Sequence, residues 1–131
     1  MLPVFLGMFL VHFLLMPALM VERIEHYRIS LNQAYMAAAM SAAMMFVMQH
    51  GLSTQNIVIY TAIFILAVLA IRTQFLVTDR QYVKEMIQHH SMALLTSRPR
   101  SMRTTNPQIL DLAKGIIQTQ EKEIALMTTL E

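Results

Sequence analysis

The segment Met86-Ile87-Gln88-His89-His90 places a thioether and two imidazoles within about one and a half turns of a predicted helix. At about 100° per residue, Met86 and His90 share an apolar face and His89 lies at its edge. The rest of that face consists of Tyr82, Val83, Ala93, Leu94 and Ser97. Methionine and histidine are ligands suited to Cu(I) or Ag(I). The segment therefore predicts a soft-metal site, and the alternative is a buried histidine beside a space-filling methionine.

The composition is that of a membrane protein. Of the 131 residues, 56% are hydrophobic, and the mean hydropathy is +0.48. The net charge of +2 comes without a basic cluster interleaved with aromatics, so nucleic acid is not an expected partner. Because the chain has no Cys and 13 Met, a soft-metal site must use Met and His.

Three uncharged stretches predict a membrane region over residues 1–77, with spans at about 2–21, 30–49 and 52–71 in the lipid bilayer. Pro17 is expected to kink or end the first span. We expect this span to be retained, since a signal peptide would need a positive start and a small-residue cleavage site. The charged loop Glu22 to Arg28 is interpreted as a short solvated connection.

Methionines recur every four residues in the second span, at Met36, Met40, Met44 and Met48. The first span has a similar series in Met8, His12, Met16 and Met20. If the two series faced each other they would form a Met-lined contact, in which His12 is a weaker metal candidate. Ordinary helix packing is the interpretation we favour, and the alanines spaced by four in the second span suit close approach.

Residues 78–131 predict a helical hairpin domain. Thr78 and Gln81 form a capping box for a helix over about 79–97, which Arg98-Pro99-Arg100 is expected to end. Asn106-Pro107 predicts the start of a second helix, over about 107–130. Its apolar stripe comprises Ile109, Ala113, Ile116, Ile117, Gln120, Ile124 and Met127.

A hairpin of this length cannot bury both of its stripes alone. We therefore expect a homodimer that forms a four-helix bundle, or a partner membrane protein, with Met86, His90, Gln120 and Met127 along the seam. The predicted fold class is all-α, with three transmembrane helices followed by this hairpin.

The last third resembles the bacterial domain-of-unknown-function family 305. The resemblance rests on D-x-x-Y-V-x-x-M-I-x-H-H-S-x-A from Asp79 and on L-A-x-x-I-I-x-x-Q-x-x-E-I-x-x-M from Leu112. It implies a ferritin-like hairpin in exported or membrane-anchored proteins, some of them connected to copper or silver. By position, the ligands it implies are Met86, His89, His90 and Met127, with Gln120 and Glu123 orienting the site. This chain departs from it in having Gln88 where many relatives have Pro, and in lacking a second hairpin.

The sequence does not predict an enzyme, because it contains no Glu-x-x-His, His-Glu-x-x-His, phosphate loop or catalytic triad order. The leading hypothesis is a membrane protein whose hairpin binds copper or silver for storage or tolerance. The alternative is a structural or assembly subunit of a membrane complex without metal. Arginines near the hairpin favour a cytoplasmic side, whereas the family resemblance favours the extracytoplasmic side, which we expect.

Overall fold

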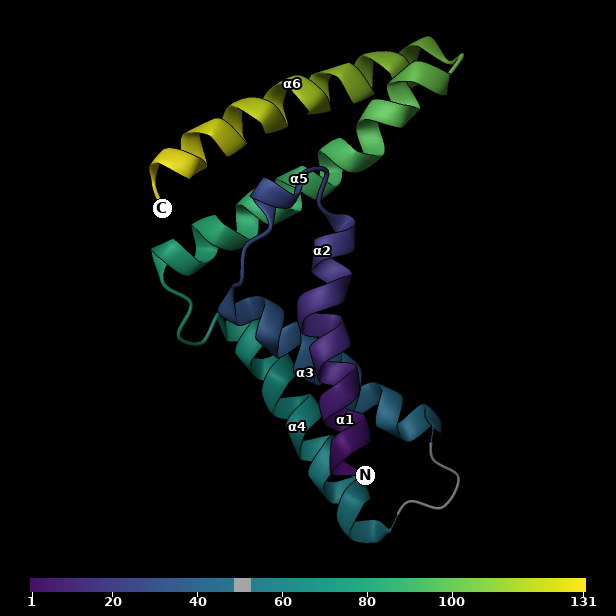
Figure 1. The fold of residues 1–131 in the computed structure, drawn as a ribbon, viewed down its shortest axis with the longest axis vertical. Helices are drawn as coiled ribbons and strands as arrows, with labels where there is room; N and C mark the ends of the chain where they lie inside the picture. Colours follow the sequence, from purple (N-terminus) through teal and green to yellow (C-terminus); the bar gives the residue numbers. More distant parts are fainter. Residues whose placement is uncertain (49–52) are drawn as a thin grey trace. The chain divides into compact units, whose positions relative to one another are not determined.

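The computed structural model describes residues 1–48 and 53–131, and in these residues it contains helices and no strand. The chain forms two compact units (Figure 1). Unit 1 comprises Met1–Met16 and Ser30–Val77, and unit 2 comprises Pro17–Ile29 and Thr78–Glu131. The segment Pro17–Ile29, which the sequence analysis placed in the membrane region, thus belongs with the hairpin.

Unit 1 is built from apolar helices. It contains α1 (Leu2–Leu10), the π-helical turn η1 (Val11–Leu15), α3 (Leu31–Met48) and α4 (Thr54–Thr73). Three stretches are long and apolar enough to cross a membrane, namely Leu2–Met20, Leu31–Met48 and Thr54–Thr73. The predicted end of the second span at residue 49 and start of the third at 52 lie outside the described residues.

The packed face of α3 is made of small residues. Ala37, Ala39 and Ala42 are buried, together with the fully buried Met45. Small side chains allow neighbouring helices to approach closely, as α3 and α4 do (Figure 1). The methionines at 36, 40, 44 and 48 are instead partly exposed, and the Met-lined contact with the first span stays a prediction.

Pro17 does not end the first helical stretch, which continues through α2 (Met16–Met20) after the π-helical turn. Proline has no N–H, so the carbonyl of Phe13, four residues earlier, loses its helical donor. The side-chain amide of the buried Gln33 donates to this carbonyl. A distant residue thereby satisfies the polar group that Pro17 leaves open.

Unit 2 contains the hairpin of α5 (Asp79–Arg103) and α6 (Pro107–Thr129), which lie side by side (Figure 1). The predicted caps are present, because Thr78 accepts from the backbone N–H of Gln81 and Asn106 accepts from those of Gln108 and Ile109. The helices pack through Ile87, Leu94 and Ile124, with Val83, Ile117 and Met127 around them.

The predicted end of the first hairpin helix at Ser97 is wrong, because α5 continues through Pro99 to Arg103. An internal proline costs about 3 kcal/mol of helix stability. Tertiary contacts of the two residues before it offset this cost, since Ser97 is buried and Arg98 bonds to Glu22 and Glu121. The connection shrinks to residues 104–106.

The segment of residues 21–29, which we call the strap, is only partly solvated. It contains the short 3-10 helix η2 (Ile24–His26), its Val21 is buried, and Glu22 and His26 are half-buried. The strap contacts α5 through polar side chains, described below. Sequence reasoning missed this because charged residues between apolar spans are typical of solvated loops.

Candidate functional site

The histidines of the hairpin lie beside different carboxylates. His90 Nε2 lies 2.7 Å from Glu123 Oε2 on α6, and the His90 side chain is 19% exposed. An ionised carboxylate only accepts hydrogen bonds, so this contact places the ring proton on Nε2. The second ring nitrogen, Nδ1, is then the one with a lone pair to offer.

His89 occupies a different environment. Its Nε2 lies 3.7 Å from Glu85 Oε1, one turn earlier on α5, and its side chain is 50% exposed. Consecutive helical residues point about 100° apart, which separates the two rings. The structure therefore brings His90 together with α6 and leaves His89 half-exposed beside the buried Glu85.

The other predicted site residues are distributed as follows. Met127 packs against the hairpin core, and Met86 and Gln120 are half-buried. His12 lies in unit 1, where its Nδ1 donates to the Met8 carbonyl at 2.8 Å. Local bonding of His12 within its own helix agrees with the packing interpretation of the first span.

The buried face of α5 is rotated relative to the predicted stripe. Ile87, Ser91 and Leu94 are fully or almost fully buried, whereas Tyr82, a predicted stripe residue, is exposed. The reason is that α5 contacts α6 on one side and the strap on another, so its buried arc is wider than a single stripe. His90 consequently lies near the edge of the buried arc.

A metal site built only from His, Cys, Asp and Glu side chains is not found among the described residues. In residues 1–48 and 53–131, no group of three or more His, Cys, Asp or Glu side chains is placed to hold a metal ion. A soft-metal site must draw on thioethers in addition to imidazole, as the sequence predicts.

Sequence reasoning missed the polar cluster between the strap and α5. Ser91, fully buried, accepts a hydrogen bond from the backbone N–H of Glu22 at 2.8 Å. Its Oγ also lies 2.9 Å from His26 Nδ1. Burial lowers the pKa of His26 below 6.5, partly opposed by the Glu25 carboxylate. Neutral His26 can therefore accept a hydrogen bond at Nδ1 from the Ser91 hydroxyl.

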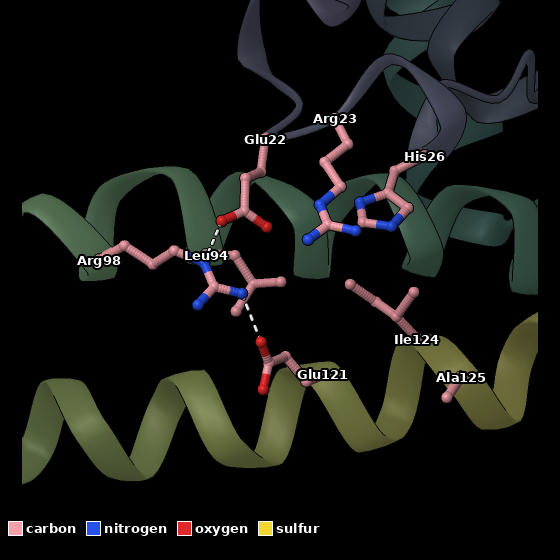
Figure 2. A pocket seen from close by; sticks show the side chains of 8 residues that line it. All are labelled: Glu22, Arg23, His26, Leu94, Arg98, Glu121, Ile124 and Ala125. Atoms are coloured by element: carbon pink, nitrogen blue, oxygen red, sulfur yellow. Dashed lines mark hydrogen bonds and ion pairs between the residues drawn. The ribbon is translucent and has the colours of Figure 1, made fainter.

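Arg98 joins three segments of unit 2. Its guanidinium donates from Nε to Glu22 and from Nη2 to Glu121 on α6, as Figure 2 shows. The hydrogen bonds that Arg98 donates to Glu121 and Glu22 raise the pKa of Arg98, which stays charged. The three charges line a cavity of about 350 Å³ whose remaining walls are Arg23, His26, Leu94, Ile124 and Ala125.

A second ion pair joins the strap to the end of α6. Arg28 Nε lies 2.6 Å from Glu131 Oε1, and Arg28 Nη2 lies 2.9 Å from Oε2. This two-point geometry is the strong form of an arginine–carboxylate pair. The hydrogen bonds from Arg28 lower the pKa of Glu131 below 4.5. A charge run that looked solvated thus contributes two of its residues to tertiary ion pairs.

These features define an all-helical protein with three candidate membrane spans and a helical hairpin. The family described as domain of unknown function DUF305 matches residues 25–131, and the chain belongs to this family. The match covers most of the strap, α3, α4 and the hairpin. The first span lies outside it.

The chain is also similar to the uncharacterized protein L153 of Acanthamoeba polyphaga mimivirus. The two are 38% identical over 110 residues, which is 79% of this chain and 72% of the relative. Because this relative is viral, the expected bacterial character of the family is not confirmed. No solved structure matches the chain.

Proposed function

We propose that this protein is a small integral membrane protein whose hairpin binds a soft metal ion, Cu(I) or Ag(I), for metal storage or tolerance. The observation that carries the proposal is the 2.7 Å hydrogen bond between His90 Nε2 and Glu123 Oε2. A histidine that binds metal through one ring nitrogen usually donates the other N–H to a carboxylate, which orients the ring. Glu123 supplies that carboxylate and leaves Nδ1 for the metal.

The thioethers proposed to complete the site come from both helices. Met86 lies one turn before His90 on α5, the spacing at which helical side chains become neighbours. Met127 lies one turn after Glu123 on α6 and packs against the core beside it. His89, which faces another direction, is proposed as a weaker ligand, with Gln120 as an orienting residue.

A second copy of the chain is the proposed partner of the hairpin. In α6, Ile109, Leu112 and Leu126 are exposed, Leu112 by 61%, and so is Leu130 just after the helix. A cavity of about 370 Å³ between α5 and α6 is lined by Thr96, Ser97, Arg100, Ile109, Leu112, Ala113 and Ile116. Large apolar side chains exposed on one face are typical of association surfaces. Two hairpins would bury them in a four-helix bundle, which we place on the extracytoplasmic side.

The test is competition for Cu(I) between the full-length chain in detergent and a chromogenic chelator. We expect His90→Ala to weaken affinity by at least tenfold, and Glu123→Gln, which removes only the orienting charge, by about 10-fold. Met86→Leu and Met127→Leu should also weaken binding. Met102→Leu serves as the control, because Met102 is exposed at the far end of α5.

Unchanged affinity in His90→Ala would reject the site. In that case the structural or assembly subunit becomes the better account, and it predicts a stable partner complex without metal dependence. Light scattering of the detergent-solubilised chain tests the dimer separately, since a monomer would contradict it without touching the affinity result.

A further inference from the structure

The exposed face of α3 carries a regular series of thioethers. Met36, Met40, Met44 and Met48 lie one helical turn apart, and each is 36 to 56% exposed. At four residues per step the series turns by about 40° each time, so neighbouring members stay on one side of the helix. The packed side of the same helix is occupied by alanines and the fully buried Met45.

Packing within the chain accounts for this series only in part. Methionine commonly fills irregular gaps in a core, and Met45 has that role. The four methionines of the series instead keep between 36 and 56% of their surface exposed. Contact with lipid does not call for methionine either, since α4 of the same unit exposes Ile57, Val58, Ile65, Leu66 and Leu69.

The spacing suits two-point coordination by sulfur. Side chains four residues apart on a helix have their Cβ atoms about 5–6 Å apart. The methionine side chain has three rotatable bonds, so two such thioethers can converge on one ion. Thioethers prefer soft ions, and α3 carries no charged residue that would attract a hard cation.

We propose that this face of α3 is a second soft-metal site, a track of three overlapping thioether pairs that binds Cu(I) or Ag(I) within a candidate membrane span. The pairs are Met36 with Met40, Met40 with Met44, and Met44 with Met48. Successive pairs are displaced along the helix by about 6 Å, four residues of 1.5 Å rise each. The track shares its class of ion with the proposed hairpin site and does not require that site to exist.

The experiment compares two double variants that differ only in spacing. Met40→Leu/Met44→Leu breaks all three pairs, whereas Met36→Leu/Met48→Leu retains the central pair. The full-length chain in detergent is loaded with Ag(I), which needs no reductant, then desalted. Bound silver per chain is counted by mass spectrometry, and silver X-ray absorption reports sulfur against nitrogen ligands. Circular dichroism verifies that each variant retains its helix content.

We expect Met40→Leu/Met44→Leu to lose at least one equivalent of silver and most of the all-sulfur signal, while Met36→Leu/Met48→Leu retains an all-sulfur ion. Met45→Leu, which changes the buried methionine, should leave the silver count unchanged. His90→Ala should remove only the signal from silver bound to nitrogen. The test of the track therefore does not depend on whether the hairpin site exists. Equal silver counts in the two double variants, whether both fall or neither does, would overturn the track.

Discussion

Ser91 and His26 lie 65 positions apart in the chain, and a hydrogen bond of 2.9 Å joins Ser91 Oγ to His26 Nδ1. The same oxygen accepts from the backbone N–H of Glu22 at 2.8 Å. One buried hydroxyl thus satisfies two polar groups of the strap and connects them to α5. Because Ser91 follows His90 directly, this contact also helps to set the rotation of α5 that turns His90 toward Glu123.

Replacing Ser91 with Ala should loosen the strap. The Glu22 N–H would lose its partner, at a cost of about 1–3 kcal/mol. Hydrogen exchange of the amides of residues 21–29 should accelerate accordingly. Ser101→Ala is the matched control on the same helix, because Ser101 Oγ only donates to the nearby Arg98 carbonyl. Equal exchange in both variants would contradict the role of Ser91.

The strap should become less stable in mild acid. Burial lowers the pKa of His26 below 6.5, so the folded chain binds a proton at His26 less readily than the unfolded chain. The stability of the neutral form is fully present above pH about 6.5 and decreases as pH falls toward the lowered pKa. Exchange at residues 21–29 should therefore accelerate between pH 7.5 and 5.5. His26→Gln, which does not titrate, should flatten this dependence, and a parallel pH response in that variant would refute the assignment.

Removing the ion pair between Arg28 and Glu131 should release the end of α6. Glu131→Gln is expected to lower the free energy of unfolding by about 1 kcal/mol, because the ion pair is bidentate and its side chains are mostly buried. Since Arg28 lowers the pKa of Glu131, the contribution of this pair is present above pH about 4.5 and is lost as pH falls further. Thermal unfolding in detergent against pH measures it. Arg28→Lys keeps the charge but loses the two-point geometry, so it should recover only part of the stability.

Gln33 should stabilise unit 1 because it bonds to the carbonyl that Pro17 leaves without a helical donor. Gln33→Met removes the donor to the Phe13 carbonyl and should lower the stability of unit 1 by about 1–3 kcal/mol. Adding Pro17→Ala restores a backbone N–H and should recover much of that loss, which makes the two substitutions non-additive in thermal unfolding. Additive effects would show that the two residues do not share this carbonyl.

Gly115→Ala should stabilise α6. Gly115 lies inside this exposed helix, and a Cβ added there would meet nothing within 4 Å. Alanine is favoured over glycine in a helix interior by about 0.5–1 kcal/mol. The thermal unfolding temperature should rise. If the substitution lowers the stability of a dimer but not that of the monomer, a second copy packs against this position.

The positions of the helices could largely be predicted from the sequence. Uncharged stretches of membrane length and the caps at Thr78 and Asn106 are local features, and the structure has helices in those places. The end of α5 could not be predicted from the sequence. Pro99 is a local stop signal, and the residues that Arg98 bonds to are far from it in the chain.

The candidate site also has features that the sequence predicts and features that depend on tertiary contacts. The sequence by itself determined that Met86, His90 and Glu123 lie on helices, because spacing and caps act within a few residues. Only the tertiary structure decided that His90 and Glu123 are bonded, that the strap bonds to Ser91, and that Met45 of α3 is buried while the other methionines of this helix are exposed. Those outcomes depend on how helices rotate against each other, and rotation is set by contacts between residues far apart in the chain.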